Sequence, residues 1–443
     1  MLIRLIAALL IVIAPHLRLS AAGTVKDREG AVRSDRNSML RSSRWIYNDL
    51  DQGFAEAKQS GRPLMVVLRC VPCKACMGLD AEVLLENRDL KPLMDQFVRV
   101  RLINANAIDL SRFQFDYDLS FTTLFFNGDG TLYGRYGSWE HQHDEQNRAT
   151  STLRQALKGA LDIHQEYPRN KPALSGKQGQ PMKHARPVDM PTLKGKFLEE
   201  LNWSGNVVKS CVHCHQIGDG IRLEIREARQ PMPTKWVYPY PAPASLGITL
   251  DDADALRIAA VEPGSHAAKA GLRAGDHLEE LGGQPLISSA DISWVLHNAP
   301  EEGALVATAR RGDTKIAAKI SLPADWRLAV SNQRRVGTWP MRAMAFGGML
   351  LEDLSDEERA KRGLGRDSMA LLAKHVGRYG KHAAAMKSGF RKDDLIIAIN
   401  GRTNRASESE MIGRMILGHQ PGAKVTATVL RGSRRIDLKI PVQ

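Results

Sequence analysis

Cysteine is scarce in this sequence of 443 residues, and its placement argues against a role as a structural staple. The five cysteines fall in two tight clusters, at positions 70, 73 and 76 and at positions 211 and 214. An exported protein that used disulfides as scaffolding would scatter its cysteines along the chain. The clustering therefore indicates chemistry at two sites.

Long apolar runs are missing after the first residues, so no later segment is predicted to span a bilayer. The N-terminal run extends from Leu5 to Pro15, follows Arg4 and precedes small residues at positions 20–22. This order is typical of a secretory signal peptide. The sequence therefore predicts a signal peptide over residues 1–22, and export of the mature chain to the periplasm or the extracellular space.

Aromatic residues make up only 6% of the chain and are not interleaved with its basic residues. Nucleic-acid platforms combine a basic groove with stacking aromatics, so nucleic-acid binding is not expected. The formal net charge of +13 lies largely in polar stretches such as 171–196. We interpret it as a solvated surface, with weak attraction to anionic lipids or acidic partners as the alternative.

The length calls for three or four domains. Residues 22–43 are polar and are expected to form a loose lead-in. The fold class is therefore multidomain, with an α/β sandwich followed by two smaller β-rich domains. The predicted divisions are an α/β domain over 44–167, a linker over 168–192, a second cysteine segment over 193–240, a β-rich domain over 244–323, a linker over 324–344, and a second β-rich domain over 345–443.

Within the α/β domain, the apolar periodicity predicts a mixed sheet covered by helices. Residues 127–130 read Asn-Gly-Asp-Gly between two apolar runs, which is a strong hairpin signal. The expected helices are 45–58, 108–115 and 150–167, with a further helix starting at the first cysteine cluster, and the expected strands are 64–68, 97–103, 123–126 and 131–136.

The first cluster reads Cys70-Val71-Pro72-Cys73-Lys74 and follows an apolar strand. A cysteine at the start of a helix gains thiolate character from the backbone N–H groups and the helix dipole, and Arg69 adds a cation beside it. Cys73 is placed to attack a mixed disulfide on Cys70, which is the logic of a dithiol exchange centre.

This segment resembles the thioredoxin superfamily over about 45–167, in its Cys-x-Pro-Cys-Lys motif, preceding strand and following hairpin. The resemblance implies a thioredoxin fold with Cys70 as nucleophile and Cys73 as resolving thiol. The tryptophan of the family is Arg69 here, and its cis-proline would fall at Thr122. Cys76 is a third thiol, which leaves a soft metal ion or a structural disulfide open as alternatives.

The second cluster reads Cys211-Val212-His213-Cys214-His215, the attachment motif of c-type haem. The segment resembles cytochrome c proteins in this motif, which implies covalent haem on both cysteines with His215 as axial metal ligand and Met232 as the best candidate for the sixth ligand. A zinc site or a simple disulfide stays open as an alternative.

The C-terminal half contains an internal repeat. Residues 270–276 read Ala-Gly-Leu-Arg-Ala-Gly-Asp and recur as Ser-Gly-Phe-Arg-Lys-Asp-Asp at 388–394. Both copies resemble PDZ domains, which implies that a peptide strand adds to one edge while loop N–H groups capture its terminal carboxylate. The residues expected to bind the peptide C-terminus are Leu246, Gly247, Ile248, Gly347, Gly348 and Met349. The alternative is that one copy only packs or dimerises.

No segment with the nucleophile pattern of a serine protease precedes the repeat, so proteolysis is not expected. The leading hypothesis is an exported thiol–disulfide or electron-transfer protein whose PDZ domains hold a peptide or protein partner. The rival hypothesis is a non-catalytic scaffold or sensor that binds metal or haem.

Overall fold

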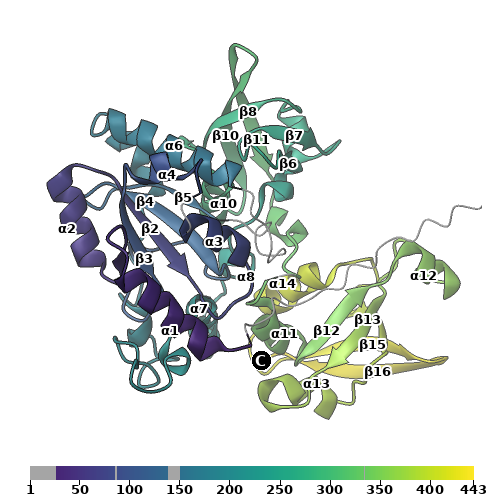
Figure 1. Cartoon of the computed structure of the whole chain (residues 1–443). Helices are drawn as coiled ribbons and strands as arrows, with labels where there is room; N and C mark the ends of the chain where they lie inside the picture. Colours follow the sequence, from purple (N-terminus) through teal and green to yellow (C-terminus); the bar gives the residue numbers. More distant parts are fainter. Residues whose placement is uncertain (1–25, 85–86, 138–149, 334) are drawn as a thin grey trace, which may run out of the picture.

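The computed structural model describes residues 26–84, 87–137, 150–333 and 335–443, so the predicted signal peptide lies outside the described residues. Figure 1 shows an α/β domain with two smaller β-rich domains beside it. Within the described ranges, no helix is both long and apolar enough to cross a membrane.

The N-terminal domain alternates helices and strands, as the periodicity predicts. In chain order its elements are α1 (Arg28–Leu40), β1 (Ile46–Tyr47), α2 (Leu50–Ser60), β2 (Leu64–Arg69), α3 (Met77–Leu84), α4 (Lys91–Met94), β3 (Val98–Leu102), β4 (Phe121–Phe126), β5 (Leu132–Tyr136) and α6 (Ser151–Glu166).

The sheet of this domain has the strand order β1-β3-β2-β4-β5. Strands β1, β3 and β2 are parallel, whereas β4 and β5 are antiparallel to their neighbours. Every residue of the central strand β2 is buried. Met65 and Val67 pack with α3, α4 and α6 on one face, and Leu64, Val66 and Leu68 pack with α2 on the other. The two-residue period thus places apolar side chains on both faces of a covered sheet.

Three local predictions were wrong, and the helix predicted from residue 45 begins only at Leu50, after strand β1. Residues 28–40 form helix α1 in place of a loose lead-in, and Asp27 caps it by accepting a hydrogen bond from the N–H of Gly30 at 2.8 Å. Residues 108–115 form turns, because their apolar side chains reach the sheet from an irregular segment. Helix α3 begins at Met77 and not at the first cysteine.

The chain between the N-terminal domain and the repeat, predicted to contain a linker, is packed against the sheet. Met190, Leu193, Val212 and Ile217 belong to the same core as β2 and α2. Its elements are the 3₁₀ helices η1 (Lys171–Lys177), η2 (Pro187–Asp189) and η3 (Val208–Ser210), and the helices α7 (Cys214–Glu227) and α8 (Thr234–Val237). The second cysteine cluster is therefore part of the N-terminal core.

The first C-terminal domain (residues 243–322) contains a small two-stranded sheet and a four-stranded sheet. Its elements are η4 (Pro243–Leu246), β6 (Ile248–Leu250), β7 (Ile258–Val261), α9 (His266–Lys269), β8 (His277–Leu281), β9 (Gln284–Pro285), α10 (Ser289–Asn298), β10 (Gly303–Arg311) and β11 (Thr314–Leu322).

Helix α10 docks this domain onto the N-terminal domain through buried polar contacts. Lys177 of η1 forms a 2.6 Å ion pair with Asp291 of α10, and both side chains are at most 2% exposed. The N–H of Arg135 on β5 donates to Asp291 at 3.1 Å, and the guanidinium of Arg135 stacks 3.7 Å from the ring of Trp294. Buried paired charges of this kind require both domains to stay in register.

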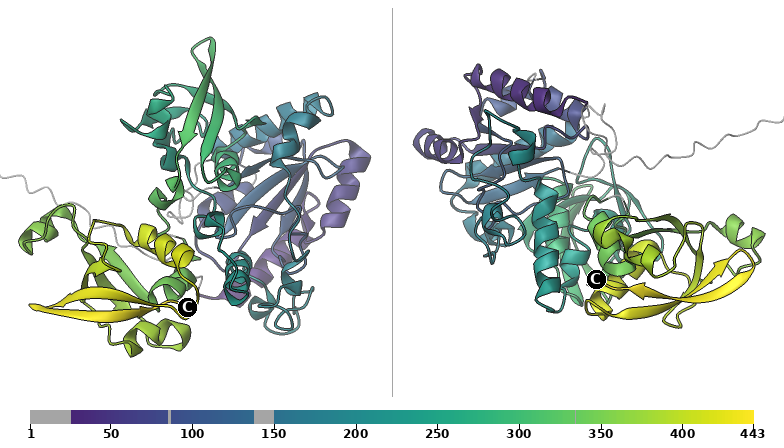
Figure 2. Two further views of the ribbon diagram at one scale, coloured as in Figure 1. Left: turned by 180° about the vertical axis from the view of Figure 1, so that it is seen from behind. Right: turned by 90° about the horizontal axis from the view of Figure 1, so that it is seen from below.

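The second C-terminal domain (residues 338–443) has a five-stranded sheet in the order β12-β13-β14-β15-β16. Its elements are α11 (Thr338–Phe346), β12 (Met349–Asp353), α12 (Asp356–Lys361), β13 (Leu371–Val376), η6 (Gly380–Ala383), α13 (Ala384–Lys387), β14 (Leu395–Ile399), α14 (Glu408–Gly418), β15 (Lys424–Arg431) and β16 (Arg434–Pro441), and η5 (Trp326–Ala329) precedes it. Figure 2 shows this domain beside the N-terminal domain.

One contact network recurs in both C-terminal domains and supports the repeat at atomic detail. In the first, Arg311 donates to both carboxylate oxygens of Asp276, at 2.7 and 2.8 Å, and to the carbonyl of Gly271 at 2.8 Å. In the second, Arg431 makes the same three bonds to Asp394 and to the carbonyl of a glycine, with the same distances. In each domain, the bidentate pair fixes the C-terminal hairpin, which carries the arginine, to the turn that carries the aspartate.

The segment predicted as the linker 324–344 is instead largely buried, and it contains η5 and most of α11. Arg342 on α11 forms a buried bidentate ion pair with Glu408 on α14, at 2.7 and 2.8 Å. Arg335 donates to Asp116 of the N-terminal domain at 2.9 Å. The connecting chain therefore ties the last domain to the rest of the molecule.

We predict that Asp291→Ala destabilises the chain by about 3–5 kcal/mol, because it leaves the buried Lys177 ammonium without its partner. Burial lowers the pKa of Lys177, which the ion pair to Asp291 opposes. The measurement is the free energy of unfolding from urea denaturation. The double variant Lys177→Met with Asp291→Ala should recover part of the loss, and additive losses would contradict this account.

Candidate functional site

Cys70 and Cys73 form a close thiol pair where strand β2 ends. Their sulfur atoms are 3.1 Å apart, and the N–H of Cys73 donates to the carbonyl of Cys70 at 3.0 Å. The N–H of Cys70 donates to the carbonyl of Ser120 at 2.8 Å. The register pairs Thr122 with Leu68, so Ser120 and not Thr122 lies beside the dithiol. The spacing is that of a dithiol able to close into a disulfide with little movement.

Arg69 holds this turn in place from within the core. Its guanidinium donates to the carbonyls of Cys70 at 2.6 Å, Cys73 at 2.8 Å and Ser120 at 3.1 Å. It also donates to Asp80 at 3.2 Å. The side chain is only 2% exposed, so the position of the family's tryptophan is taken by a buried cation that fixes the backbone.

A chain of buried charges continues behind Arg69. Asp80 accepts from Arg101 at 2.7 Å, and Arg101 also donates to Asp35 of α1 at 2.6 Å. Burial alone would raise the pKa of Asp80, but Arg101 and Arg69 lower it below its ordinary value. The network therefore keeps Asp80 ionised, which keeps the Arg69 charge paired.

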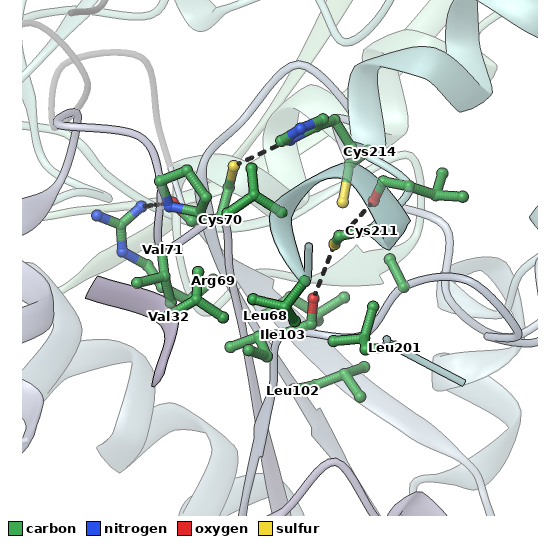
Figure 3. A pocket seen from close by; sticks show the side chains of 16 residues that line it. Val32, Leu68, Arg69, Cys70, Val71, Leu102, Ile103, Leu201, Cys211 and Cys214 are labelled. Atoms are coloured by element: carbon green, nitrogen blue, oxygen red, sulfur yellow. Dashed lines mark hydrogen bonds between the residues drawn. The ribbon is translucent and has the colours of Figure 1, made fainter. Parts of the chain in front are cut away.

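The second cysteine cluster covers the first. The Nδ1 atom of His213 lies 3.5 Å from the sulfur of Cys70. Figure 3 shows Cys70 on one side of a pocket and Cys211 and Cys214 on the other. The pocket is mostly apolar and has a cavity volume of about 30 Å³, enough for one or two water molecules.

The electrostatics distinguish the two thiols of the first pair. The pKa of Cys73 falls to about 6, because Cys70 donates a hydrogen bond to its thiolate, against the effect of burial and with help from Arg69 and His215. The hydrogen bond to Cys73 and burial raise the pKa of Cys70 well above its ordinary value. The direction of the two shifts runs against the expectation that Cys70 is the easily ionised thiol. Helix α3 begins seven residues after Cys70, so Cys70 does not lie at a helix N-terminus.

The pKa values of the two histidines of the second cluster are shifted in opposite directions. Burial and the neighbouring His215 lower the pKa of His213 to about 4, so its ring is neutral at pH 7. Burial opposes protonation of His215, but its bond to Asp219 at 3.4 Å raises its pKa. The ring of His215 is stacked on that of His213, with 5.9 Å between centroids. The cluster thus places a neutral ring beside Cys70, and a more basic imidazole, that of His215, where it helps to lower the pKa of Cys73.

Cys76 lies apart from both pairs. It is 1% exposed in the core with α3 and α6, and its φ of 59° places it outside a helix. Burial raises its pKa to about 11. The expected row of three thiols on one helix face is therefore absent. Among the described residues, no group of three or more metal-ligating side chains is positioned to hold an ion.

The residues of the haem motif do not fit a porphyrin in this arrangement. Cys211 and Cys214 face the small pocket, and Cys214 also packs against the sheet core. Burial raises the pKa of Cys211 to about 11 and that of Cys214 to about 12. Met232 lies in the core of the second C-terminal domain. A haem bound at His215 would require the start of α7 to move away from Cys70 and Cys73.

In the first C-terminal domain, Leu246, Gly247 and Ile248 stand at the junction of η4 and β6. Gly247 has φ of 79°, and a Cβ there would lie 2.2 Å from the Cβ of Ser265, so a glycine is required. Strand β6 pairs only with β7, which leaves its other edge unpaired within the described sheet. This edge has the position that the expected peptide needs.

The corresponding loop of the second C-terminal domain is occupied by the protein itself. The N–H groups of Gly347 and Gly348 donate to carbonyls of α11 at 3.1 and 3.0 Å. Met349 is fully buried, and the N–H of Leu351 on the outer edge of β12 donates to Glu408 at 2.8 Å. The predicted carboxylate donors of this copy are therefore engaged, because the preceding segment is a helix that ends at Gly347.

Sequence reasoning missed His213 as a neighbour of Cys70 and missed the charges at Asp80, Arg101 and Asp35. Position 213 lies 143 residues from Cys70, and no local pattern encodes that contact. The alternating Val-Arg-Val-Arg of β3 held a usable signal, because an arginine in a fully buried strand requires a buried carboxylate.

Comparisons with known proteins agree with two of these domains. A thioredoxin-like family model matches residues 45–128, and a PDZ domain model matches residues 257–310. The chain thus contains a thioredoxin-like domain and a PDZ domain, as predicted. No curated protein matches the chain.

Solved structures similar to part of the chain include HtrA-type proteases. A variant of the HtrA-type protease AlgW with a decapeptide is 25% identical over 22% of this chain and 28% of its own, with a TM-score of 0.19. AlgW with a decapeptide is 20% identical over 30% and 37%, and AlgW with a tripeptide is 19% identical over 30% and 40%, each with a TM-score of 0.19. This chain therefore spans well under half the length of these relatives.

We predict that alkylation of Cys73 by iodoacetamide is half-maximal at about pH 6, because the thiolate is the reactive form. Reactivity should be present at pH 7 and lost as the pH falls through 6. The measurement is the alkylation rate of each cysteine by fragment-ion mass spectrometry, with Cys76 as the internal control that stays protected below about pH 11. A midpoint for Cys73 near the ordinary value of about 8.5 would refute the assignment.

Proposed function

We propose that this chain is an exported thiol–disulfide exchange protein that holds a peptide or protein partner through its first PDZ domain. The observation that carries the proposal is the Cys70–Cys73 pair, with sulfur atoms 3.1 Å apart and one thiol acidified to a pKa of about 6. A dithiol with one ionised sulfur at neutral pH is poised for exchange with a client disulfide. Export rests on the predicted signal peptide over residues 1–22.

In the proposed exchange, the Cys73 thiolate attacks a client disulfide and releases one client thiol. Cys70 then attacks Cys73 within the resulting mixed disulfide, which releases the second client thiol and leaves a Cys70–Cys73 disulfide. Two thiols of the protein are oxidised while one client disulfide is reduced. Arg69 serves as a positioning residue, since it holds the carbonyls of both cysteines in one geometry.

The assignment of roles differs from the one that the thioredoxin resemblance implies. Cys73 has the lower pKa, and Cys70 faces the pocket beneath His213. A thiolate attacks readily when its pKa lies near the ambient pH, whereas a protonated thiol attacks slowly. These observations favour Cys73 as the client-facing sulfur.

Peptide recognition is proposed for the first PDZ domain. Its strand β6 has an unpaired edge next to the glycine loop at Gly247. We regard the second C-terminal domain as a second PDZ copy whose groove is filled by α11 and by the Arg342–Glu408 pair. The second copy then has a packing role, which was the alternative for one of the two copies.

We predict that Cys70→Ser accumulates a mixed disulfide with a client peptide that carries one activated disulfide, whereas Cys73→Ser does not. The serine hydroxyl at position 70 can still donate to the Cys73 thiolate, so the acidity is retained. The measurement is the mass of the protein after acid quenching, with Cys76→Ala as the matched control that should behave like wild type. Accumulation on Cys70 in the Cys73→Ser variant would reverse the roles.

An insulin reduction assay separates the proposed function from a scaffold or sensor role. Wild type should be well above background, and both single serine variants should lose most of the turnover because resolution needs two thiols. Equal, near-background rates in wild type and both variants would favour the scaffold.

We predict that a peptide bound by the full chain loses affinity by roughly 10-fold or more when its C-terminus is amidated, because hydrogen bonds to a charged carboxylate contribute about 1.5–3 kcal/mol. The measurement is fluorescence anisotropy with a labelled peptide selected from a C-terminal library. Gly247→Ala should abolish binding, and Gly363→Ala, at a glycine with open space around its Cβ position in the second domain, is the matched control. Equal affinity for free and amidated peptides would remove carboxylate capture from the proposal.

A further inference from the structure

Two dithiols that are far apart in sequence line one cavity. Cys70 comes from the end of β2, and Cys211 and Cys214 come from the start of α7, with the three sulfur-bearing side chains around a single pocket (Figure 3). The lining includes Cys70 but not Cys73. The remaining walls are mainly apolar.

The thiols are also close enough to alter one another's ionisation. The charge on Cys214 raises the pKa of Cys70, after larger effects from Cys73 and burial. A charge on Cys73 raises the pKa of both Cys211 and Cys214, for which burial is the largest cause. Coupling of this kind across the pocket requires short separations between the two pairs.

We propose that Cys211 and Cys214 form a second redox-active dithiol that reduces the Cys70–Cys73 disulfide inside the protein, through the shared pocket. The proposal deepens the proposed function, because it regenerates the client-facing dithiol from within. It also replaces the haem interpretation of the second cluster, because a pocket with a cavity volume of about 30 Å³ has no room for a porphyrin.

The transfer balances without any further oxidant or reductant. One thiolate of the second pair attacks the sulfur of Cys70, a Cys70–Cys211 or Cys70–Cys214 bond forms, and the Cys70–Cys73 bond breaks with Cys73 leaving as thiolate. The remaining thiol of the second pair then attacks its neighbour, which forms the Cys211–Cys214 disulfide and releases Cys70. The second pair gives up two protons; one returns to Cys70, and the other goes to solvent above about pH 6, where Cys73 stays ionised.

Two features set the direction. Cys73 is the thiol with the lowest pKa of the group, and a low pKa makes a good leaving group and stabilises the reduced form of its pair. Cys211 and Cys214 have raised pKa values, so their disulfide is the harder one to open. The neutral ring of His213 lies 3.5 Å from the sulfur of Cys70, so it contacts that sulfur when Cys70 is released.

The first experiment locates the disulfide in the full mature chain. The reduced protein is oxidised with one equivalent of diamide, quenched in acid, alkylated and digested with trypsin, which separates residues 70–74, 75–88 and 210–222. Wild type should carry the disulfide on 210–222 with at least about 10-fold preference. In Cys211→Ser with Cys214→Ser, it should stay on 70–74, and Cys76 should be alkylated throughout.

The second experiment traps the intermediate and guards against misfolded variants. Two double variants are oxidised mildly. The variant Cys73→Ser with Cys211→Ser should form a Cys70–Cys214 disulfide, or the variant Cys73→Ser with Cys214→Ser should form a Cys70–Cys211 disulfide. In neither variant should Cys70 form a disulfide with Cys76. A wild-type disulfide confined to 70–74 would overturn the proposal, and so would the absence of a link in both traps. So would a Soret band and a haem mass on 210–222 after expression in a host that attaches haem.

The outcomes for the two proposals are distinguishable. Wild type that reduces insulin but keeps its disulfide on 70–74 would retain the proposed exchange function and reject the internal transfer. Wild type that transfers the disulfide to 210–222 but leaves insulin untouched would retain the internal transfer and reject the client reaction.

Discussion

The buried guanidinium of Arg69 is the interaction on which the site depends. It donates hydrogen bonds to the carbonyls of Cys70 and Cys73, and its charge is balanced by Asp80. Arg101 in turn contacts both Asp80 and Asp35 of the N-terminal helix. An unpaired cation in this core would be too costly to keep, so the helix α1, the strand β3 and the cysteine turn have to assemble together. The geometry of the thiols is thus set by a charge network and not by a helix start.

The same constraint explains why the second cysteine segment is part of the first domain. Its apolar side chains complete the core beneath the sheet, and His213 is delivered to Cys70 by that packing. The Lys177–Asp291 pair then fixes the first PDZ domain against the sheet edge, so the peptide-binding and thiol sites are held in one arrangement. In the proposed function, partner capture and thiol exchange are therefore joined by buried ion pairs instead of by flexible chain.

Much of the fold could be predicted from the sequence. The period of the apolar residues gave β2 through β5 and α6 nearly to the residue, and the repeated turn containing Asp276 and Asp394 gave two related domains. The failures share a cause: the stretches 168–192 and 324–344 are polar or rich in proline, yet each contributes buried side chains to the core. Composition reports local preference, whereas their burial is decided by surfaces far along the chain.

The sequence by itself determined the candidate residues for chemistry, namely two cysteine pairs and a glycine loop, because motif spacing is a local property. Only the tertiary structure decided how they combine. It placed Cys211 and Cys214 across a small pocket from Cys70, shifted the acidic thiol to Cys73, and engaged the N–H groups of Gly347 and its neighbour. Ionisation, access and pairing depend on groups brought together through space, and a linear pattern contains no record of them.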